Sequence, residues 1–163
     1  MVEAYLSGPI VNASLRKDDF YRVVVDTLEE LGITVFAPQF SPKVNPTETY
    51  RRDTNAVRMC DFVVAEVSSP SLGVGMEIML AIELVKPILM FCRKDSKDLS
   101  YMVQGADGKA LFEYESVSDV RTFLLERSLE SLMVQQCPSC SSQVAEITDE
   151  GLRCILCLRK FTV

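Results

Sequence analysis

The stretch Ser68–Ala81, SSPSLGVGMEIMLA, contains the clearest candidate for chemistry in this chain. Its glycines, Gly73 and Gly75, allow a close approach of the backbone to a ligand. The Ser71 hydroxyl and the free N–H groups at the start of the following helical pattern favour an anion. Glu77 lies in the predicted first turn of that helix. A carboxylate there either complements the helix dipole, which is worth about 0.3–1 kcal/mol, or acts on a ligand bound at the glycines.

Histidine is absent from all 163 residues. This excludes Ser-His-Asp and Cys-His mechanisms and every metal site that needs a histidine. Acid–base and nucleophilic work must therefore fall to carboxylate, Tyr, Lys or Cys side chains. Asp53, in TYRRDTNAVRM, is a second candidate carboxylate, although it could instead pair with Arg51 or Arg52 on an exposed helix face.

Four cysteines near the C-terminus form two CxxC pairs, Cys137 with Cys140 and Cys154 with Cys157. Two such pairs predict two knuckles that together hold one structural Zn²⁺; a pair of redox disulfides is the alternative. Metal binding would supply folding energy that so short a segment lacks. Residues 137–163 carry three basic and three acidic side chains, which favours a stabilising or partner-binding role over nucleic-acid binding.

Strand-like and helix-like segments alternate over the first 130 residues. Strands are expected at Ala4–Ser7, Ile33–Ala37, Phe62–Val67, Ile88–Cys92 and Lys109–Tyr114. Helices are expected at Arg16–Leu31, Glu48–Met59 and Gly73–Val85, and from Val117 to about Leu132. The alternation predicts a doubly wound, flavodoxin-like or Rossmann-like five-stranded parallel sheet with helices on both faces. We assign it residues 1–132, and a small zinc ribbon residues 133–163.

Doubly wound sheets bind ligands beyond the carboxyl ends of their strands, near the point where strand order reverses. Three segments follow predicted strands in this way: Ser7–Asn12, Ser68–Gly75 and Arg93–Ser100. The glycine stretch with its carboxylate is therefore predicted to lie in the ligand crevice.

Composition narrows the class of protein further. The chain is 48% hydrophobic, enough for a sizeable core, but no apolar run approaches the roughly 18 residues of a membrane span. The N-terminus lacks the pattern of a secretory signal, so we expect a cytoplasmic protein with no membrane partner. A formal net charge of −6 opposes general binding to a phosphate backbone, which makes nucleic acid an improbable partner.

Four segments together resemble a known family. SPSLGVGMEI, preceded by DFVVAEV and by Asp53, is similar to the 2′-deoxynucleoside 5′-monophosphate N-hydrolases, which share a superfamily with the nucleoside 2-deoxyribosyltransferases. YLSGPI and LSYMVQGADG resemble a first loop and a further substrate loop of the same family. The resemblance runs colinearly over residues 3–128. It implies hydrolysis of a nucleotide to free base and 2-deoxyribose 5-phosphate, with no cofactor for catalysis.

The resemblance also implies roles for individual residues. Glu77 matches the carboxylate that attacks C1′ of the sugar, Asp53 the second acid, which assists base departure, and Tyr5 a tyrosine close to the nucleophile. Ser71 matches the serine that binds the 5′-phosphate. Ser100 matches a serine that reaches this phosphate from a neighbouring subunit, which implies a homodimer. The other implied substrate-binding positions are Ser7, Gly8, Pro9, Ile10, Gly73, Gly75 and Met102.

Two positions depart from the hydrolase pattern. Pro9 and Val11 stand where these hydrolases commonly carry Ser and Arg, so a bidentate phosphate contact is missing. Ser71 and Ser100 point back to a phosphate, because transferases tend to carry an acid and an amide there. The hydrolase is our prediction; a nucleoside 2-deoxyribosyltransferase and a non-catalytic nucleotide sensor are the alternatives. Tyr5 could be an ordinary strand aromatic, and Ser100 a helix cap.

Overall fold

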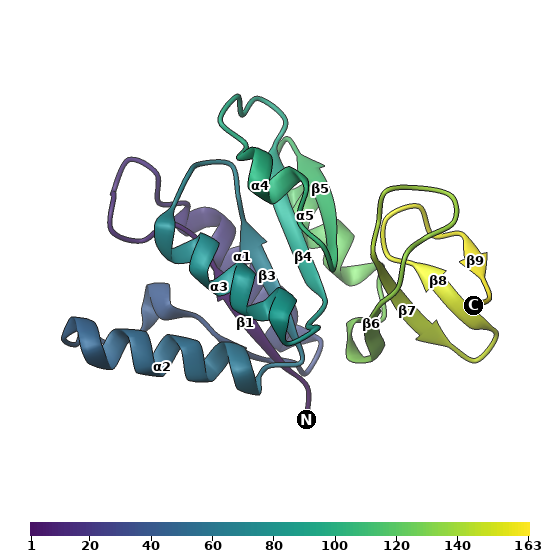
Figure 1. Cartoon of the computed structure of the whole chain (residues 1–163), viewed down its shortest axis with the longest axis horizontal. Coiled ribbons are helices and arrows are strands. Elements are labelled where there is room, and N and C mark those ends of the chain that lie inside the picture. Colours follow the sequence, from purple (N-terminus) through teal and green to yellow (C-terminus); the bar gives the residue numbers. More distant parts are fainter.

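The computed structural model describes all of residues 1–163, as an α/β domain followed by a small antiparallel sheet (Figure 1). The strands of the first domain are β1 (Glu3–Ser7), β2 (Thr34–Phe36), β3 (Phe62–Glu66), β4 (Ile88–Arg93) and β5 (Lys109–Tyr114). Its helices are α1 (Asp18–Glu30), α2 (Pro46–Met59), α3 (Leu72–Glu83), α4 (Tyr101–Gln104) and α5 (Val117–Leu125), with a 3₁₀ turn η1 (Pro38–Phe40). None of these helices is long and apolar enough to cross a membrane.

The five strands form one parallel sheet in the order β2-β1-β3-β4-β5. The predicted doubly wound fold is thus confirmed, with strand order reversing between β1 and β3. β3, with the sequence FVVAE, is buried along its whole length, as expected for a strand covered on both faces. The carboxyl ends of β1 and β3 open onto the crevice where such sheets bind ligands.

Apolar side chains pack the helices against both faces of the parallel sheet. On one face α1 packs against α5, over a core that contains Leu6, Val64 and Phe91. On the other face α2 packs against α3, over Tyr5 and Val63. Because side chains alternate along a strand, Tyr5 and Ser7 of β1 lie on the same side as α2 and α3, whereas Leu6 lies on the opposite side.

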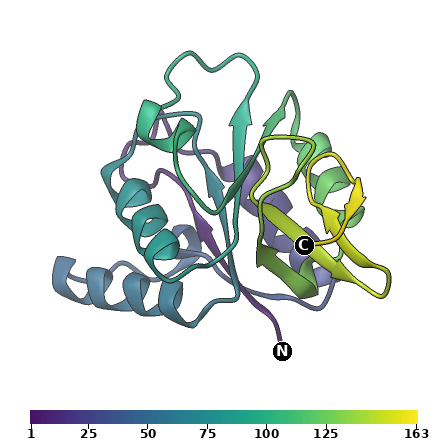
Figure 2. The ribbon, with the colours of Figure 1, turned by 45° about the vertical axis from the view of Figure 1, so that its right-hand side comes forward.

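The C-terminal residues form a second, antiparallel sheet of four short strands in the order β6-β7-β8-β9. It lies beside β5 and α5, at the end of the sheet far from α2 (Figures 1 and 2). Val144 and Ile155 of this region belong to the same apolar cluster as Phe123 and Leu124 of α5. The strands are β6 (Leu132–Val134), β7 (Val144–Thr148), β8 (Gly151–Cys154) and β9 (Lys160–Phe161).

The predicted end of the last helix and the predicted place of Glu77 in a first helical turn were both wrong. α5 ends at Leu125 rather than near Leu132, and the chain turns through the 3₁₀ segment η2 (Leu129–Ser131) into β6. Leu129 is buried in the main core and Ser128 N donates to Glu146 Oε2, so contacts with the second sheet replace the helix. α3 begins at Leu72, which puts Glu77 in its second turn. The helix-dipole interpretation of Glu77 is thereby weakened, since that effect fades beyond the first turn.

Candidate active site

Tyr5, Ser7 and Glu77 form a hydrogen-bonded cluster at the carboxyl end of β1. The Tyr5 hydroxyl donates to Glu77 Oε1 at 2.7 Å, and the Ser7 hydroxyl donates to Glu77 Oε2. β1 presents both hydroxyls on one face, while α3 brings the carboxylate from 70 and 72 positions away in the sequence. Because Tyr5 and Ser7 are fully buried, the two donors that hold the carboxylate are fixed in position.

The environment of Glu77 makes it a weaker acid than an ordinary glutamate. Burial raises the pKa of Glu77 from 4.5 to about 7, against the opposing effect of the Ser7 and Tyr5 hydrogen bonds. The negative charge of Asp53 adds to the increase. Burial, together with the Glu77 charge, also raises the pKa of Tyr5, so the phenol keeps its proton and remains a donor. Perturbed carboxyl groups of this kind concentrate at functional sites.

Asp53 lies on the buried side of α2 and is paired with its neighbour in sequence. Arg52 Nε donates to Asp53 Oδ1 at 2.7 Å, and Arg52 also donates to the Pro42 carbonyl at 2.9 Å. The guanidinium stands 5.8 Å from the centre of the Phe36 ring, which itself stacks on Tyr5. Asp53 therefore does form an ion pair with an adjacent arginine, which was the alternative to a catalytic role. The pair occurs beside Glu77 rather than on an exposed face.

The first loop is fixed by Tyr21 of α1. A Cβ atom on Gly8 would collide with the Tyr21 ring, with the phenol oxygen only 2.5 Å away. The same hydroxyl donates to the Pro9 carbonyl at 2.7 Å, and Tyr21 is fully buried. Glycine is therefore required at position 8 by space. Ile10 follows in this loop, and Val11 is fully exposed where the resembling hydrolases carry an arginine.

Ser71 caps α3, since Val74 N donates to its hydroxyl oxygen at 3.5 Å. Gly73 and Gly75 lie inside the helix rather than in a turn before it, and a Cβ atom on either would meet open space. The first turn of α3 is thus accessible to a ligand, although packing within the chain does not demand glycine there.

A cavity of about 690 Å³ lies between α3 and α4. Ser71, Gly75, Ser100 and Met102 are among its lining residues, and most of its wall is apolar. The Tyr5–Ser7–Asp53–Glu77 group is not part of this lining. The structure therefore brings the predicted catalytic residues together in one place, and several of the predicted substrate-binding residues line a neighbouring cavity.

Glu66, the last residue of β3, organises the carboxyl ends of three strands. It is buried, accepts from Ser68 N at 2.6 Å and from the Ser68 hydroxyl at 3.1 Å, and accepts from the Tyr114 hydroxyl of β5 at 2.8 Å. The Ser68 oxygens in turn accept from Arg93 N and from the Ser96 hydroxyl. The loops that carry Ser71 and Ser100 are therefore anchored to one buried carboxylate; its position at the end of a strand was the available signal.

Gln39 was also missed. It is buried next to β1, its Nε2 donates to the Leu6 carbonyl at 3.2 Å, and its Oε1 is the one buried side-chain polar atom without a hydrogen-bond partner. Arg16 donates to its main-chain carbonyl at 2.9 Å. No sequence pattern singles out this glutamine, because its significance depends on the neighbouring strand.

The four C-terminal cysteines converge into a possible metal site. Their sulfur atoms all lie within 4.8 Å of one another, and none forms a disulfide. The closest pairs join the two knuckles: Cys137 Sγ is 3.8 Å from Cys157 Sγ, and Cys140 Sγ is 3.5 Å from Cys154 Sγ. A tetrahedral thiolate site with metal–sulfur bonds of about 2.3 Å has sulfur–sulfur edges of roughly 3.8 Å, so the donors fit such an ion.

Glu77 and Asp53 lie at the switch point of a doubly wound sheet, where such folds bind ligands, and paired carboxylates are the groups that glycosidases commonly use. Comparison with known proteins agrees. Residues 4–120 match the family described as Nucleoside 2-deoxyribosyltransferase, which covers more than half of the chain. The chain belongs to the nucleoside 2-deoxyribosyltransferase family, and the resemblance seen in its sequence is confirmed.

Relatives with curated names are nucleotide hydrolases. The 5-hydroxymethyl-dUMP N-hydrolase of Danio rerio is 42% identical over 122 residues, which cover 69% of this chain and 85% of that enzyme. A protein of Methanosarcina mazei named putative 2′-deoxynucleoside 5′-phosphate N-hydrolase 1 is 29% identical over 138 residues, with 80% of each chain covered. The match spans only 58% of the length of the Rattus norvegicus 5-hydroxymethyl-dUMP N-hydrolase, at 38% identity over 56% of this chain.

Solved structures share the fold. A CMP N-glycosidase of Clostridium botulinum superposes with a TM-score of 0.62 at 20% identity, covering 76% of this chain and 98% of that one. A 2-deoxyribosyltransferase of Bacillus psychrosaccharolyticus gives a TM-score of 0.57 at 20% identity, with 74% and 90% covered. The family's α/β architecture is therefore present in nearly the whole of each structure.

Proposed function

We propose that this protein hydrolyses the N-glycosidic bond of (2′-deoxy)nucleoside 5′-monophosphates, giving free base and (2-deoxy)ribose 5-phosphate. The observation that carries the proposal is Glu77, a partly buried carboxylate held on both oxygens by the hydroxyls of Tyr5 and Ser7. The names of the hydrolase relatives support the same substrate class. A pure nucleotide sensor has no need to hold Glu77 and Asp53 together beside an anion.

The chemistry follows from the carboxylates. Glu77 attacks C1′ as its bond to the base nitrogen breaks, and the bonding electrons leave with the base. Asp53 orients the reacting groups and assists protonation of the departing base. Water then forms a bond to C1′ and gives up a proton, which replaces the one taken up by the base. The Glu77 ester bond breaks, and its electrons return to the carboxylate. Tyr5 and Ser7 hold Glu77 throughout by donating to its oxygens. The scheme uses no cofactor.

For phosphate recognition we infer Ser71, the open first turn of α3, and the loop Gly8–Ile10. Free N–H groups and a hydroxyl at a helix N-terminus suit a phosphate. Gly73 and Gly75 leave that turn uncovered, since nothing packs at their Cβ positions. Val11, fully exposed, supplies no charge where a hydrolase arginine would stand. Binding of the phosphate therefore depends on main-chain and hydroxyl donors.

We infer a homodimer in which Ser100 and Met102 reach the site of a second subunit. Within one subunit neither residue joins the Glu77 cluster; both line the cavity beside α3. The surface around this cavity is apolar and uncovered: Leu72 is 91% exposed, Tyr101 90% and Met102 82%. Large exposed apolar surfaces mark association sites. A second copy would cover this face and complete the phosphate site.

We infer that the cysteine cluster holds a structural Zn²⁺, bound by Cys137, Cys140, Cys154 and Cys157. A closed four-thiolate site has no position for substrate, so the ion would stabilise the fold rather than take part in catalysis. We assign residues 133–163 to this module and residues 1–132 to the N-glycosidase module.

The alternative activity is a nucleoside 2-deoxyribosyltransferase. The loop Gly8–Pro9 favours it, because a proline there removes the phosphate-binding serine of the hydrolases, and the family's description carries the transferase name. A transferase would pass the sugar from Glu77 to a second base instead of to water.

A chromatographic screen separates these activities. Purified protein is incubated with each 2′-deoxynucleoside 5′-monophosphate, with the matching nucleosides and with CMP, in the presence and absence of a second free base. Release of base from a monophosphate, lost in Glu77→Ala, supports the hydrolase and identifies its base. Turnover of nucleosides only when a second base is present makes the protein a transferase. Binding without release from any of them overturns both activities.

A further inference from the structure

The cysteine module, residues 133–163, is hydrogen-bonded to the outer edge of β5 through a single residue, Gln143. β5 is the last strand of the parallel sheet. Gln143 N donates to the Lys109 carbonyl at 2.8 Å, and Gly108 N donates to Gln143 Oε1 at 2.8 Å. Gly108 has a left-handed φ of 69° and packs near the Val134 side chain of β6. The start of β5 therefore depends on the second sheet for its edge contacts.

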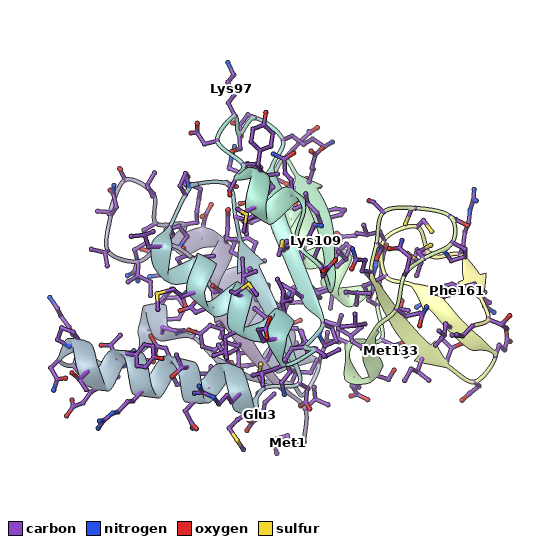
Figure 3. The ribbon with its side chains drawn as sticks, viewed as in Figure 1. Met1, Glu3, Lys97, Lys109, Met133 and Phe161 are labelled. Atoms are coloured by element: carbon purple, nitrogen blue, oxygen red, sulfur yellow. The ribbon has the colours of Figure 1, made fainter.

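Lys109, whose carbonyl accepts from Gln143 N, is also hydrogen-bonded to the segment that lines the cavity between α3 and α4. Its side chain is buried, which lowers the pKa of its ammonium group, and its Nζ donates to the Ala106 carbonyl at 2.6 Å. Gly105, Ala106 and Asp107 line the cavity together with Ser100. Figure 3 labels Lys109 on the side of the parallel sheet that faces the second sheet. The segment 105–109 thus joins α4 to the cysteine module.

The other end of the connection lies at the metal site. Gln143 comes three residues after Cys140, and its carbonyl accepts from Gln135 N at 2.9 Å. The preceding residue, Ser142, is fully buried, and its carbonyl accepts from Cys137 N at 2.8 Å. The backbone that positions Gln143 is therefore the backbone that closes the first cysteine knuckle.

We propose that Gln143 is a positioning residue through which the four-cysteine module holds residues 105–109, and with them α4, in the arrangement that binds substrate. α4 has only four residues and cannot hold its own position, because so short a helix is not stable by itself. Its start follows Ser100, and its end leads into the segment that Gln143 fixes. The kinetic part of this inference rests on the proposed function; the structural part does not.

Gln143→Ala tests the connection while leaving all four cysteines in place. Hydrogen exchange at the Gly108 amide should become roughly tenfold faster, since its acceptor is lost. KM for the monophosphate substrate should rise about tenfold, with kcat within twofold of the wild type. Bound zinc, measured by elemental analysis, should stay at the wild-type ratio. Gln143→Glu should restore both values, because a carboxylate accepts the same bond.

Gln135→Ala is the matched control, since Gln135 directly follows β6, its main-chain N donates to the Gln143 carbonyl, and its side chain makes no hydrogen bond; Gly108 exchange should not change. Removing the metal from the wild type with a chelator should accelerate exchange at Gly108 but not at Val64 in the sheet centre. Unchanged Gly108 exchange after both Gln143→Ala and chelation overturns the connection. Faster exchange with an unchanged KM overturns the positioning role. A protein without N-glycosidase activity would still report on the connection through exchange.

Discussion

At the scale of single residues, Glu77 is distinguished by what surrounds it rather than by its place in the helix. The sequence indicates Glu77 and Tyr5 through the family motif, but the hydrogen bond between them spans 72 positions and exists only in the folded chain. The Ser7 hydroxyl completes the pair of donors. Together they hold a carboxylate in a site where burial opposes its charge.

Because burial opposes the charge of Glu77, the free energy of unfolding should depend on pH differently in the wild type and in a variant that cannot ionise at this position. Because the pKa of Glu77 rises from 4.5 in the unfolded chain to about 7 in the fold, its contribution to stability is fully present below pH 4.5 and is lost as the pH rises through 7. Glu77→Gln cannot ionise. Its amide keeps one acceptor oxygen for the Tyr5 and Ser7 hydroxyls, so any loss from the second contact is the same at both pH values. Relative to the wild type, we expect its free energy of unfolding to be higher at about pH 8.5 than near pH 5.5, by on the order of 2 kcal/mol.

Urea denaturation of both proteins at the two pH values measures this difference. Glu83→Gln is the control, since Glu83 is an exposed carboxylate on the same helix and should behave like the wild type at either pH. A difference between Glu77→Gln and wild type that is the same at both pH values would show that Glu77 ionises like an exposed glutamate and that burial does not raise its pKa.

At the scale of elements, the buried side chain of Glu66 links the ends of β3, β4 and β5 through hydrogen bonds. Glu66 has no basic partner and is satisfied entirely by neutral donors, from Ser68 and Tyr114. Through Ser68 it also fixes the exit of β4 at Arg93. Loops that carry binding residues are precise only when such contacts hold them.

Glu66→Gln should disturb these loops without removing volume. An amide has one acceptor oxygen where the carboxylate has two, so at least one donor among Ser68 N and the Tyr114 hydroxyl loses its partner. We expect a loss of about 1–3 kcal/mol in the free energy of unfolding and a larger increase in KM than decrease in kcat. Chemical denaturation and steady-state kinetics measure the two effects. Glu113→Gln, at an exposed position on β5, is the control and should change neither the free energy of unfolding nor KM. If Glu66→Gln also changed neither quantity, the hydrogen-bond network around Glu66 would not hold these loops.

Elements whose signal lies within their own sequence were predicted, whereas those that depend on contacts with distant residues were not. The five parallel strands were predicted because runs such as FVVAEV carry their own signal of burial. The end of α5 was not, because Glu146, from a strand beyond the helix, captures the backbone of Ser128. Strands of two to five residues in the cysteine module were equally invisible, since their register depends on the cysteine cluster and on β5.

At the scale of the whole molecule, one apolar face and one added module remain beyond the family's α/β fold. The face around Leu72, Met76 and Tyr101 is exposed on the subunit. The loop between β4 and α4, whose Lys97 projects furthest from the body in Figure 3, rises beside it. We expect two subunits to associate through this face, because isolated subunits would leave its apolar side chains in water.

Met76→Lys should weaken this association. A lysine at the centre of an apolar interface loses buried area and introduces an unpaired charge. We expect the variant to sediment as a monomer at concentrations where the wild type is dimeric, and to lose N-glycosidase activity while keeping its fold by circular dichroism. Met59→Lys, at the last residue of α2 and exposed to a similar extent, is the control. A wild type that is monomeric and active would contradict the shared site.

The central claim, that Glu77 performs N-glycosidic cleavage of a nucleotide, is tested most directly by the rate of base release from the best 2′-deoxynucleoside 5′-monophosphate. Wild type, Glu77→Gln and Glu83→Gln would be compared at one pH and saturating substrate. Loss of a nucleophile should lower kcat by at least about a thousandfold in Glu77→Gln and leave Glu83→Gln within twofold. If Glu77→Gln released base as fast as Glu83→Gln, Glu77 would not be the nucleophile and the proposed mechanism would be wrong.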